Sequence, residues 1–230
     1  LQRHFIFHLK KFIYSMLLFG LIILIRPVNG LVILLLPFLA MSPVKLREAF
    51  TATVKRPLLL LTGIAGTLTL ISLQFIIYKI QTGSFFVDAY GDESFDFTNP
   101  HIFSFLFSFK KGLFLYLPIT FLSLIGFIAL WKKNRFVAGS LLGFLIVLVY
   151  VYASWWCWYY GGSFGTRVMV EWMALFGILL LFAFRVFEKK IWKYTFAACM
   201  LLLTAFCQVQ TYQYRYYVIH WSEMTKEKYI

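Results

Sequence analysis

The sequence predicts an all-α fold, a polytopic bundle of transmembrane helices, and three observations lead to it. Hydrophobic residues make up 61% of the 230-residue chain, and the mean hydropathy is +0.79. Several apolar runs have about the twenty residues that a helix needs to cross a bilayer. Charged residues are only 13% of the chain and gather in short clusters between these runs. We expect residues 1–230 to form a single transmembrane domain, the C-terminal part of a longer protein.

Five apolar runs have the length and the charged flanks of membrane spans. They cover residues 58–78, 113–130, 136–153, 168–184 and 191–207. Two shorter runs, residues 12–25 and 31–41, are separated by the motif RPVNG. Proline lacks an amide donor and restricts the residue before it, so Arg26-Pro27 interrupts any helix here. One long kinked helix and a hairpin of two short helices both fit, and we favour the hairpin, which makes seven helical elements.

The basic residues predict which ends of the helices face the cytoplasm. With 22 Lys and Arg against nine Asp and Glu, the chain has a net charge of +13. In this context the cations indicate topology and contact with lipid headgroups, so nucleic acid is not an expected partner. The clusters in three connections would all lie on one side, the cytoplasmic one: Lys45, Arg47, Lys55 and Arg56; Lys132, Lys133 and Arg135; and Arg185, Lys189, Lys190 and Lys193.

The opposite, outer side then receives a long connection that carries four of the nine acidic residues. Its GDESFDF core alternates acids with aromatic residues, and residues 102–109 are apolar but too short to span. We expect a helix lying in the membrane interface there. The acids are solvating residues of an exposed loop, or ligands of an acceptor hydroxyl, a sugar or a divalent cation. They are Asp88, Asp92, Glu93 and Asp96. No other metal site and no catalytic residue is predicted.

The stretch YASWWCWYYGGSFGTR, residues 152–167, also falls on the outer side. Trp and Tyr collect at the level of lipid headgroups, which accounts for part of this composition. The glycines suit a tight passage of the backbone, and Arg167 opens the next span, where an unpaired charge is costly. Glu171 follows at i+4, so in an α-helix the two form an ion pair, or Glu171 orients Arg167 toward a phosphate. Arg26 at the other break invites the same proposal.

Several motifs in order resemble the C-terminal half of bacterial integral-membrane glycosyltransferases of the GT-C superfamily. The motifs are LIRPVNG, YGDESFDFTNP, FSFKKGLFLYLP, WWCWYYGGSFGTR, QTYQY and MTKEKY. Relatives in this superfamily include protein O-mannosyltransferases and the aminoarabinose transferases of lipid A. The resemblance implies a multi-pass protein of the bacterial cytoplasmic (inner) membrane that transfers a sugar from a polyprenyl-phosphate donor to an acceptor at the outer face. It also implies that the catalytic acid lies in an outer loop upstream of this chain.

The resemblance also assigns roles to individual residues. Arg26 and Arg167 would neutralise the donor phosphate, where charge develops during transfer. The acceptor entrance would be lined by Tyr90, Glu93 and Asp96, and the lipid-linked sugar would be flanked by Trp155, Trp156 and Trp158. The expected partners are therefore a lipid-linked sugar donor, membrane lipids and an acceptor. Two alternatives remain open: a transporter or flippase of lipid-linked sugars, because broken helices with arginines also suit translocation, and a non-catalytic membrane scaffold.

Overall fold

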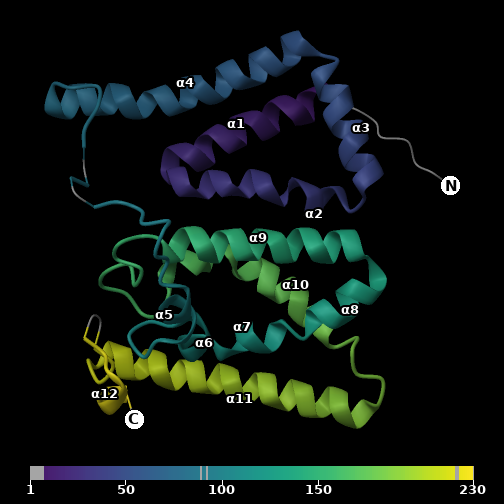
Figure 1. The fold of residues 1–230 in the computed structure, drawn as a ribbon, viewed down its shortest axis with the longest axis vertical. Coiled ribbons are helices and arrows are strands. Elements are labelled where there is room, and N and C mark those ends of the chain that lie inside the picture. Colours follow the sequence, from purple (N-terminus) through teal and green to yellow (C-terminus); the bar gives the residue numbers. More distant parts are fainter. Residues whose placement is uncertain (1–7, 89, 92, 221–222, 230) are drawn as a thin grey trace. The chain divides into compact units, whose positions relative to one another are not determined.

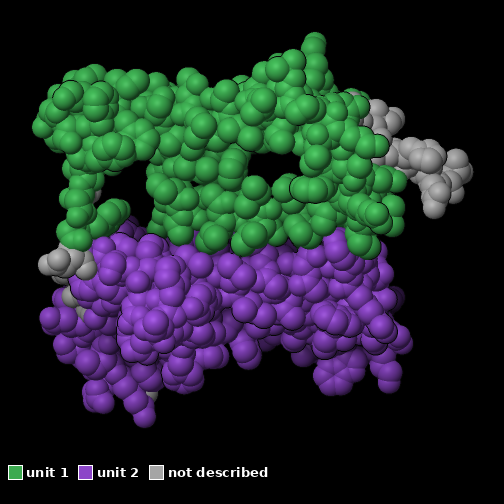
Figure 2. All heavy atoms as spheres, turned by 45° about the horizontal axis from the view of Figure 1, so that its top comes forward, with its two compact units in different colours: residues 1–92 green, residues 93–230 purple. Residues whose placement is uncertain are grey.

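A computed structural model of the chain describes residues 8–88, 90–91, 93–220 and 223–229. The chain forms two compact units, unit 1 (Leu1–Asp92) and unit 2 (Glu93–Ile230), which Figure 2 shows in separate colours. Each unit is described by itself below. The expectation of a single transmembrane domain stays a prediction.

Unit 1 consists of helices joined by tight turns (Figure 1). They are α1 (Leu9–Ile25), the 3-10 helix η1 (Pro27–Leu35), α2 (Leu36–Ala40), α3 (Pro43–Val54) and α4 (Pro57–Thr82). The backbone of Arg26 is extended, with φ −156° and ψ 105°, so α1 ends there. The chain then reverses, and a Cβ on Gly30 would lie 3.4 Å from Ile23, so η1 packs back on α1. The predicted break and the hairpin are both confirmed within this unit.

Helices α1 and α4 pack closely because small residues meet at their contact. A Cβ on Gly20 would lie only 3.1 Å from the Cα of Thr67. The Thr67 hydroxyl donates a 2.8 Å hydrogen bond to the Met16 carbonyl across the contact. Small residues and hydroxyl bonds are the usual means by which helices associate in lipid, where burial of apolar surface adds little.

Unit 2 contains more, and shorter, helices than the sequence predicts. They are α5 (Ile102–Phe107), α6 (Leu113–Tyr116), α7 (Pro118–Ser123), α8 (Gly126–Lys133), α9 (Arg135–Ala153), η2 (Arg167–Trp172), α10 (Met173–Ala183), α11 (Lys190–Arg215) and α12 (Lys226–Tyr229). Three helices of the described chain are long and apolar enough to cross a membrane, namely α4, α9 and α11. These three identify a membrane protein, and the expected bundle of seven helices is not confirmed.

Two predicted spans are not continuous α-helices. Residues 113–130 divide into α6, α7 and α8, because Pro118 begins α7 and the preceding Leu117 is forced out of the helical region, with φ −134° and ψ 63°. Residues 168–184 begin as the 3-10 helix η2 and become α-helical only at Met173. Apolar composition predicts these segments but not their interruptions.

The expected interfacial helix is also different in the structure. Helix α5 has only six residues, and the Phe105 side chain is fully buried. It packs against α6 and α9 rather than lying freely in the interface. The tail beyond Cys207 is partly helical as well, because α11 continues to Arg215 before the chain folds back.

The two ends of unit 2 differ in chemistry. At one end the Phe182 ring lies 5.3 Å from Lys133 Nζ and 5.3 Å from the Arg185 guanidinium carbon. The α8–α9 turn and the α10–α11 connection therefore meet there, as Figure 1 also shows. The turn after α9 and the C-terminal tail lie at the other end. Two of the predicted basic clusters thus share one end, as expected from the positive-inside rule.

Substitution of Gly126 by Ala should destabilise unit 2. A Cβ at Gly126 would lie 1.9 Å from the Leu179 carbonyl oxygen, so α8 must move away from α10. We expect a loss of about 1–3 kcal/mol, the usual effect of overpacking, measured as a lower melting temperature in detergent. Gly139→Ala in α9 is the control, since no atom lies within 4 Å of its Cβ position. Equal melting temperatures for the two variants would contradict this packing.

Candidate functional site

The turn after α9 pairs with the loop that precedes α5. The Asp96 amide donates a 2.7 Å hydrogen bond to the Ser154 carbonyl, and the Trp156 amide donates one of 3.1 Å to the Ser94 carbonyl. The Phe95 and Trp155 rings meet edge to face, with centroids 4.7 Å apart. Two segments some sixty positions apart in the sequence therefore form one surface. We call the part of unit 2 made of residues 93–101, 108–112 and 154–167 the aromatic end.

Backbone conformation explains the glycines of this turn. Gly161 has φ +64° and Gly165 has φ +55°, values that favour glycine over residues with a Cβ. A Cβ on Gly165 would also approach the Tyr116 side chain to 3.1 Å, so the turn passes close to α6. The glycines allow the chain to fold around the segment that joins α5 to α6.

The turn encloses a lysine that the sequence analysis did not select. Only 2% of Lys111 is exposed. Its ammonium donates hydrogen bonds to the Gly161 carbonyl and, at 3.3 Å, to the Ser163 hydroxyl. Its own carbonyl accepts a 2.5 Å hydrogen bond from the Thr166 hydroxyl. The aromatic, glycine-rich turn therefore encloses the buried ammonium of Lys111.

Two further cations lie near this ammonium. The Lys110 ammonium lies 3.4 Å from the centre of the Tyr159 ring, and the Lys111 ammonium lies 6.0 Å from it. Burial lowers the pKa of Lys111 to about 8, and the charges of Arg167 and Lys110 act in the same direction, against an opposing effect of Cys157. No carboxylate of the described residues is among the groups that act on this pKa. The aromatic end thus concentrates positive charge.

The three tryptophans expected to flank a sugar all lie at the aromatic end. Trp155 packs on Phe95, as described above, while half of the Trp156 side chain is exposed. The Trp158 ring lies 5.6 Å from Tyr159 and 6.3 Å from His101. Trp156 therefore has the largest free surface for stacking on a ligand, whereas Trp155 helps to hold the outer loop.

The predicted acidic residues differ in their surroundings. Asp96 accepts hydrogen bonds from the Thr98 hydroxyl and amide and from the Asn99 amide, at 2.6, 2.9 and 3.1 Å. These bonds, led by that of the Thr98 hydroxyl, lower the pKa of Asp96, so its carboxylate shapes a turn. Glu93 is exposed, and Tyr90 is exposed and belongs to unit 1.

The acids do not form a metal site in the described part of the chain. Asp88 bonds the amides of Tyr90 and Gly91 at 3.3 and 3.0 Å, which again makes a turn. Asp92 lies outside the described residues. Among the described His, Cys, Asp and Glu side chains, no group of three could hold a metal ion. The expected role of these acids at an acceptor entrance stays a prediction.

Arg167 and Glu171 lie in a 3-10 helix, not in the α-helix assumed for their pairing, and the pairing itself stays a prediction. Both are exposed and both lie in η2, which is a 3-10 helix. With three residues per turn, positions i and i+4 are rotated by about 120° from one another, whereas in an α-helix they share a face. The charge of Arg167 acts on Lys111 and lowers the pKa of its ammonium.

Arg26 occupies the break between α1 and η1, where its amide bonds the Ile22 carbonyl at 3.1 Å. Its side chain is half-buried. Arg26 belongs to unit 1 and Arg167 to unit 2. The expectation that both arginines serve one phosphate stays a prediction.

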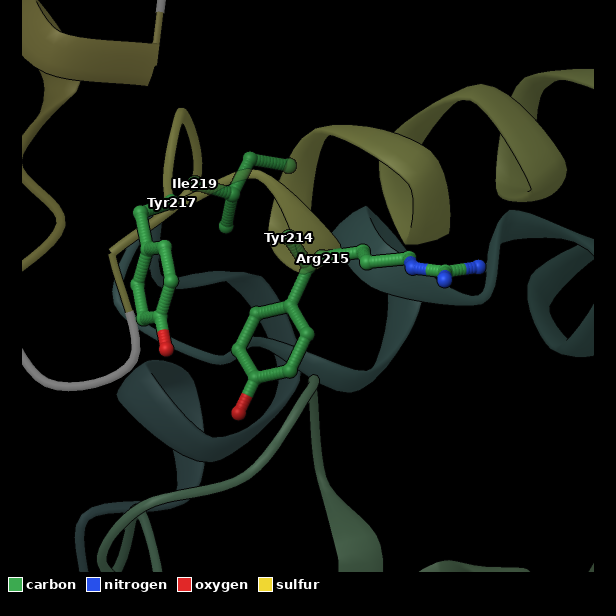
Figure 3. A pocket seen from close by; sticks show the side chains of 4 residues that line it. All are labelled: Tyr214, Arg215, Tyr217 and Ile219. Carbon is green, nitrogen blue, oxygen red and sulfur yellow. The ribbon is translucent and has the colours of Figure 1, made fainter.

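Two cavities lie in unit 2. One, of about 370 Å³, is almost wholly apolar and is formed by α5, α6, α8, α9 and α10, with Leu106 and Leu113 on either side of the two lysines in the sequence. The other, of about 160 Å³, is lined by Tyr214, Arg215, Tyr217 and Ile219. In Figure 3 the rings of Tyr214 and Tyr217 point to the same side, while the Arg215 side chain extends away from them.

The C-terminal tail packs against the aromatic end. Buried Ile219 and Met224 form a cluster with Tyr116, and the Phe164 ring lies 5.4 Å from Tyr116 and 5.5 Å from Tyr214. Residues 219–220 and 223–229 of the tail therefore fold back onto unit 2.

Comparisons with known proteins give no match. No protein-family model matches the chain, and neither a curated protein nor a solved structure is similar to it. The function therefore has to be argued from the aromatic end itself.

The buried ammonium predicts an unusual pH dependence of stability. The pKa of Lys111 is about 8 in the folded chain against a reference value of 10.5, so between these pH values the unfolded chain binds more protons, and stability rises with pH. We expect the melting temperature of the wild type to rise between pH 7.5 and 9 relative to that of Lys111→Gln. Parallel melting curves over this range would show that Lys111 titrates normally.

Proposed function

We propose that the chain belongs to a membrane glycosyltransferase that takes its sugar from a polyprenyl-phosphate donor at the aromatic end of unit 2. The observation that carries this proposal is that the charges of Lys110 and Arg167 both act on the buried Lys111 ammonium, with no described carboxylate acting on it. An anionic group is the ligand that such a cluster attracts, and phosphate esters suit the planar fork of a guanidinium.

The surroundings of the cations also suit a sugar linked to a lipid. Exposed Trp156 offers a ring face to a pyranose, and aromatic rings near the membrane surface have one apolar and one polar side. The lining of the apolar cavity includes Leu106 and Leu113, which flank the lysine pair in the sequence, and the cavity can hold hydrocarbon. A phosphate near the cations, a sugar on the aromatic side and a prenyl chain in the cavity make one amphiphilic ligand.

Electrostatics would make this arrangement useful for transfer. When the glycosidic bond breaks, negative charge develops on the departing phosphate, and fixed cations in a poorly solvated site stabilise it strongly. In this proposal Arg167 contacts the phosphate, whereas the catalytic acid is expected upstream of this chain. Transfer is therefore best measured with the full-length protein.

Replacement of Arg167 by Lys should lower sugar transfer by about tenfold or more. The charge remains, but two parallel hydrogen bonds to phosphate are lost, and each 1.4 kcal/mol of transition-state stabilisation is a factor of ten in rate. Turnover is measured with a radiolabelled prenyl-phosphate sugar and compared at equal protein amounts. Arg185→Lys, at the opposite end of unit 2, is the matched control and should be silent. Unchanged transfer in Arg167→Lys would remove this residue from the donor site.

Cysteine labelling should place the aromatic end outside the cell. We expect Glu93→Cys to react with a membrane-impermeant maleimide on intact cells, and Lys132→Cys to react only after lysis, in a chain whose native Cys157, Cys199 and Cys207 are replaced. The reason is that the basic α8–α9 and α10–α11 connections meet at the other end of unit 2. The reverse labelling pattern would be incompatible with an outward-facing donor site.

A further inference from the structure

The Lys111 ammonium is a buried charge whose compensation is incomplete. It is 2% exposed, and its hydrogen-bond partners, the Gly161 carbonyl and the Ser163 hydroxyl, are both neutral. A buried charge is costly unless an opposite charge pairs with it. Here the charges of Arg167 and Lys110 have the same sign and add to the cost, and Cys157 opposes them only in part. An anion bound near Lys111 would therefore lower the electrostatic cost of its buried charge.

We propose that Lys111 is the buried counter-charge of an anion site, and that binding of a phosphate ester to the aromatic end is coupled to the uptake of one proton by its amine. The step is balanced: the neutral Lys111 amine, a proton from water and the anion give an ammonium and a bound anion, and no covalent bond to the ligand changes. The choice of a phosphate ester rests on the proposed function, whereas the coupling rests on the burial of Lys111 and on its neutral hydrogen-bond partners.

Arg167 and Lys110 are the two cations of the cluster that would contact the ligand. Arg167 is exposed and Lys110 is half-buried, so these two can contact an anion directly while Lys111 lies behind them. Lys111 is thus a positioning residue. Its ammonium holds the turn through the Gly161 carbonyl, and its buried positive charge adds to the attraction of the site for an anion. The Lys110 ammonium already lies over the Tyr159 ring, which fixes one edge of the site.

The groups that face Lys111 determine the pH range of the coupling. Lys110 and Arg167 disfavour its protonated form, while Cys157 favours it, and the Tyr159 ring lies 6.0 Å from the ammonium. In the free protein the pKa of Lys111 is about 8, lowered chiefly by burial. A bound anion stabilises the ammonium and raises this pKa. Below pH 8 both states are protonated, and above it binding must take up a proton, so affinity falls as the pH rises.

The experiment measures this affinity against pH on the full-length protein in detergent. The lipid probe is farnesyl-phosphoryl-mannose, a phosphodiester whose charge is constant over the range, and the soluble probe is methyl phosphoryl-mannose. We expect the affinity for the lipid probe to fall about tenfold or more between pH 7.5 and 9.5. Calorimetry in two buffers of different ionisation enthalpy should show proton uptake near pH 9 and none near pH 7.

Four variants separate Lys111 from its neighbours. Lys111→Arg keeps a charge that does not titrate in this range, so the affinity should become independent of pH, and Lys111→Gln should bind weakly with the same lack of dependence. Lys110→Gln should bind more weakly and keep a pH dependence, displaced to higher pH because Lys110 lowers the pKa of Lys111. Cys157→Ser removes a group that favours the protonated form of Lys111, so the pH dependence should persist and move to lower pH.

The outcomes distinguish the inference from the proposed function. Binding that is independent of pH in the wild type, or a pH dependence that survives in Lys111→Arg and Lys111→Gln, would overturn the coupling and leave the glycosyltransferase proposal intact. Equal affinities for the lipid and soluble probes, with the coupling present, would support the anion site but count against a lipid-linked donor. Absence of binding by either probe would overturn both.

Discussion

The ammonium of Lys111 and the turn that encloses it organise one end of unit 2. Its bonds to Gly161 and Ser163, together with the bond from Thr166 to its carbonyl, join the segment between α5 and α6 to the segment between α9 and η2. The outer loop is added to the same surface through Asp96 and Ser154. The aromatic rings, glycines and cations of the aromatic end come from separate parts of the sequence. The fold brings them together around the buried Lys111 ammonium.

Composition correctly predicted the three apolar helices that are long and continuous. The runs at residues 58–78, 136–153 and 191–207 lie within α4, α9 and α11, and the Arg26-Pro27 break is where α1 ends. The run at residues 113–130 was misjudged because hydropathy reports the environment of a segment and not its continuity. Pro118 was visible in the sequence and is the residue that marks this interruption.

The candidate site was only partly predictable, for two physical reasons. The concentration of Trp, Tyr and Gly after α9 correctly indicated an unusual turn, but Lys111 lies about fifty positions away, and a single sequence does not show which distant segments meet. The Lys-Lys pair before Gly112 follows the apolar run 102–109, and nothing in the sequence marks either lysine as buried. The pairing of Arg167 with Glu171 assumed an α-helix, and the 3-10 geometry of η2 changes the faces on which they lie.

The protonation state of Lys111 can be observed directly by NMR of the protein labelled with ¹³C and ¹⁵N at lysine, assigned with Lys111→Arg. Burial and the neighbouring cations predict a titration midpoint near pH 8 in the free protein and a higher midpoint when a phosphodiester is bound. A midpoint at the ordinary value of about 10.5 for lysine in both states would contradict the buried, uncompensated charge on which the site depends.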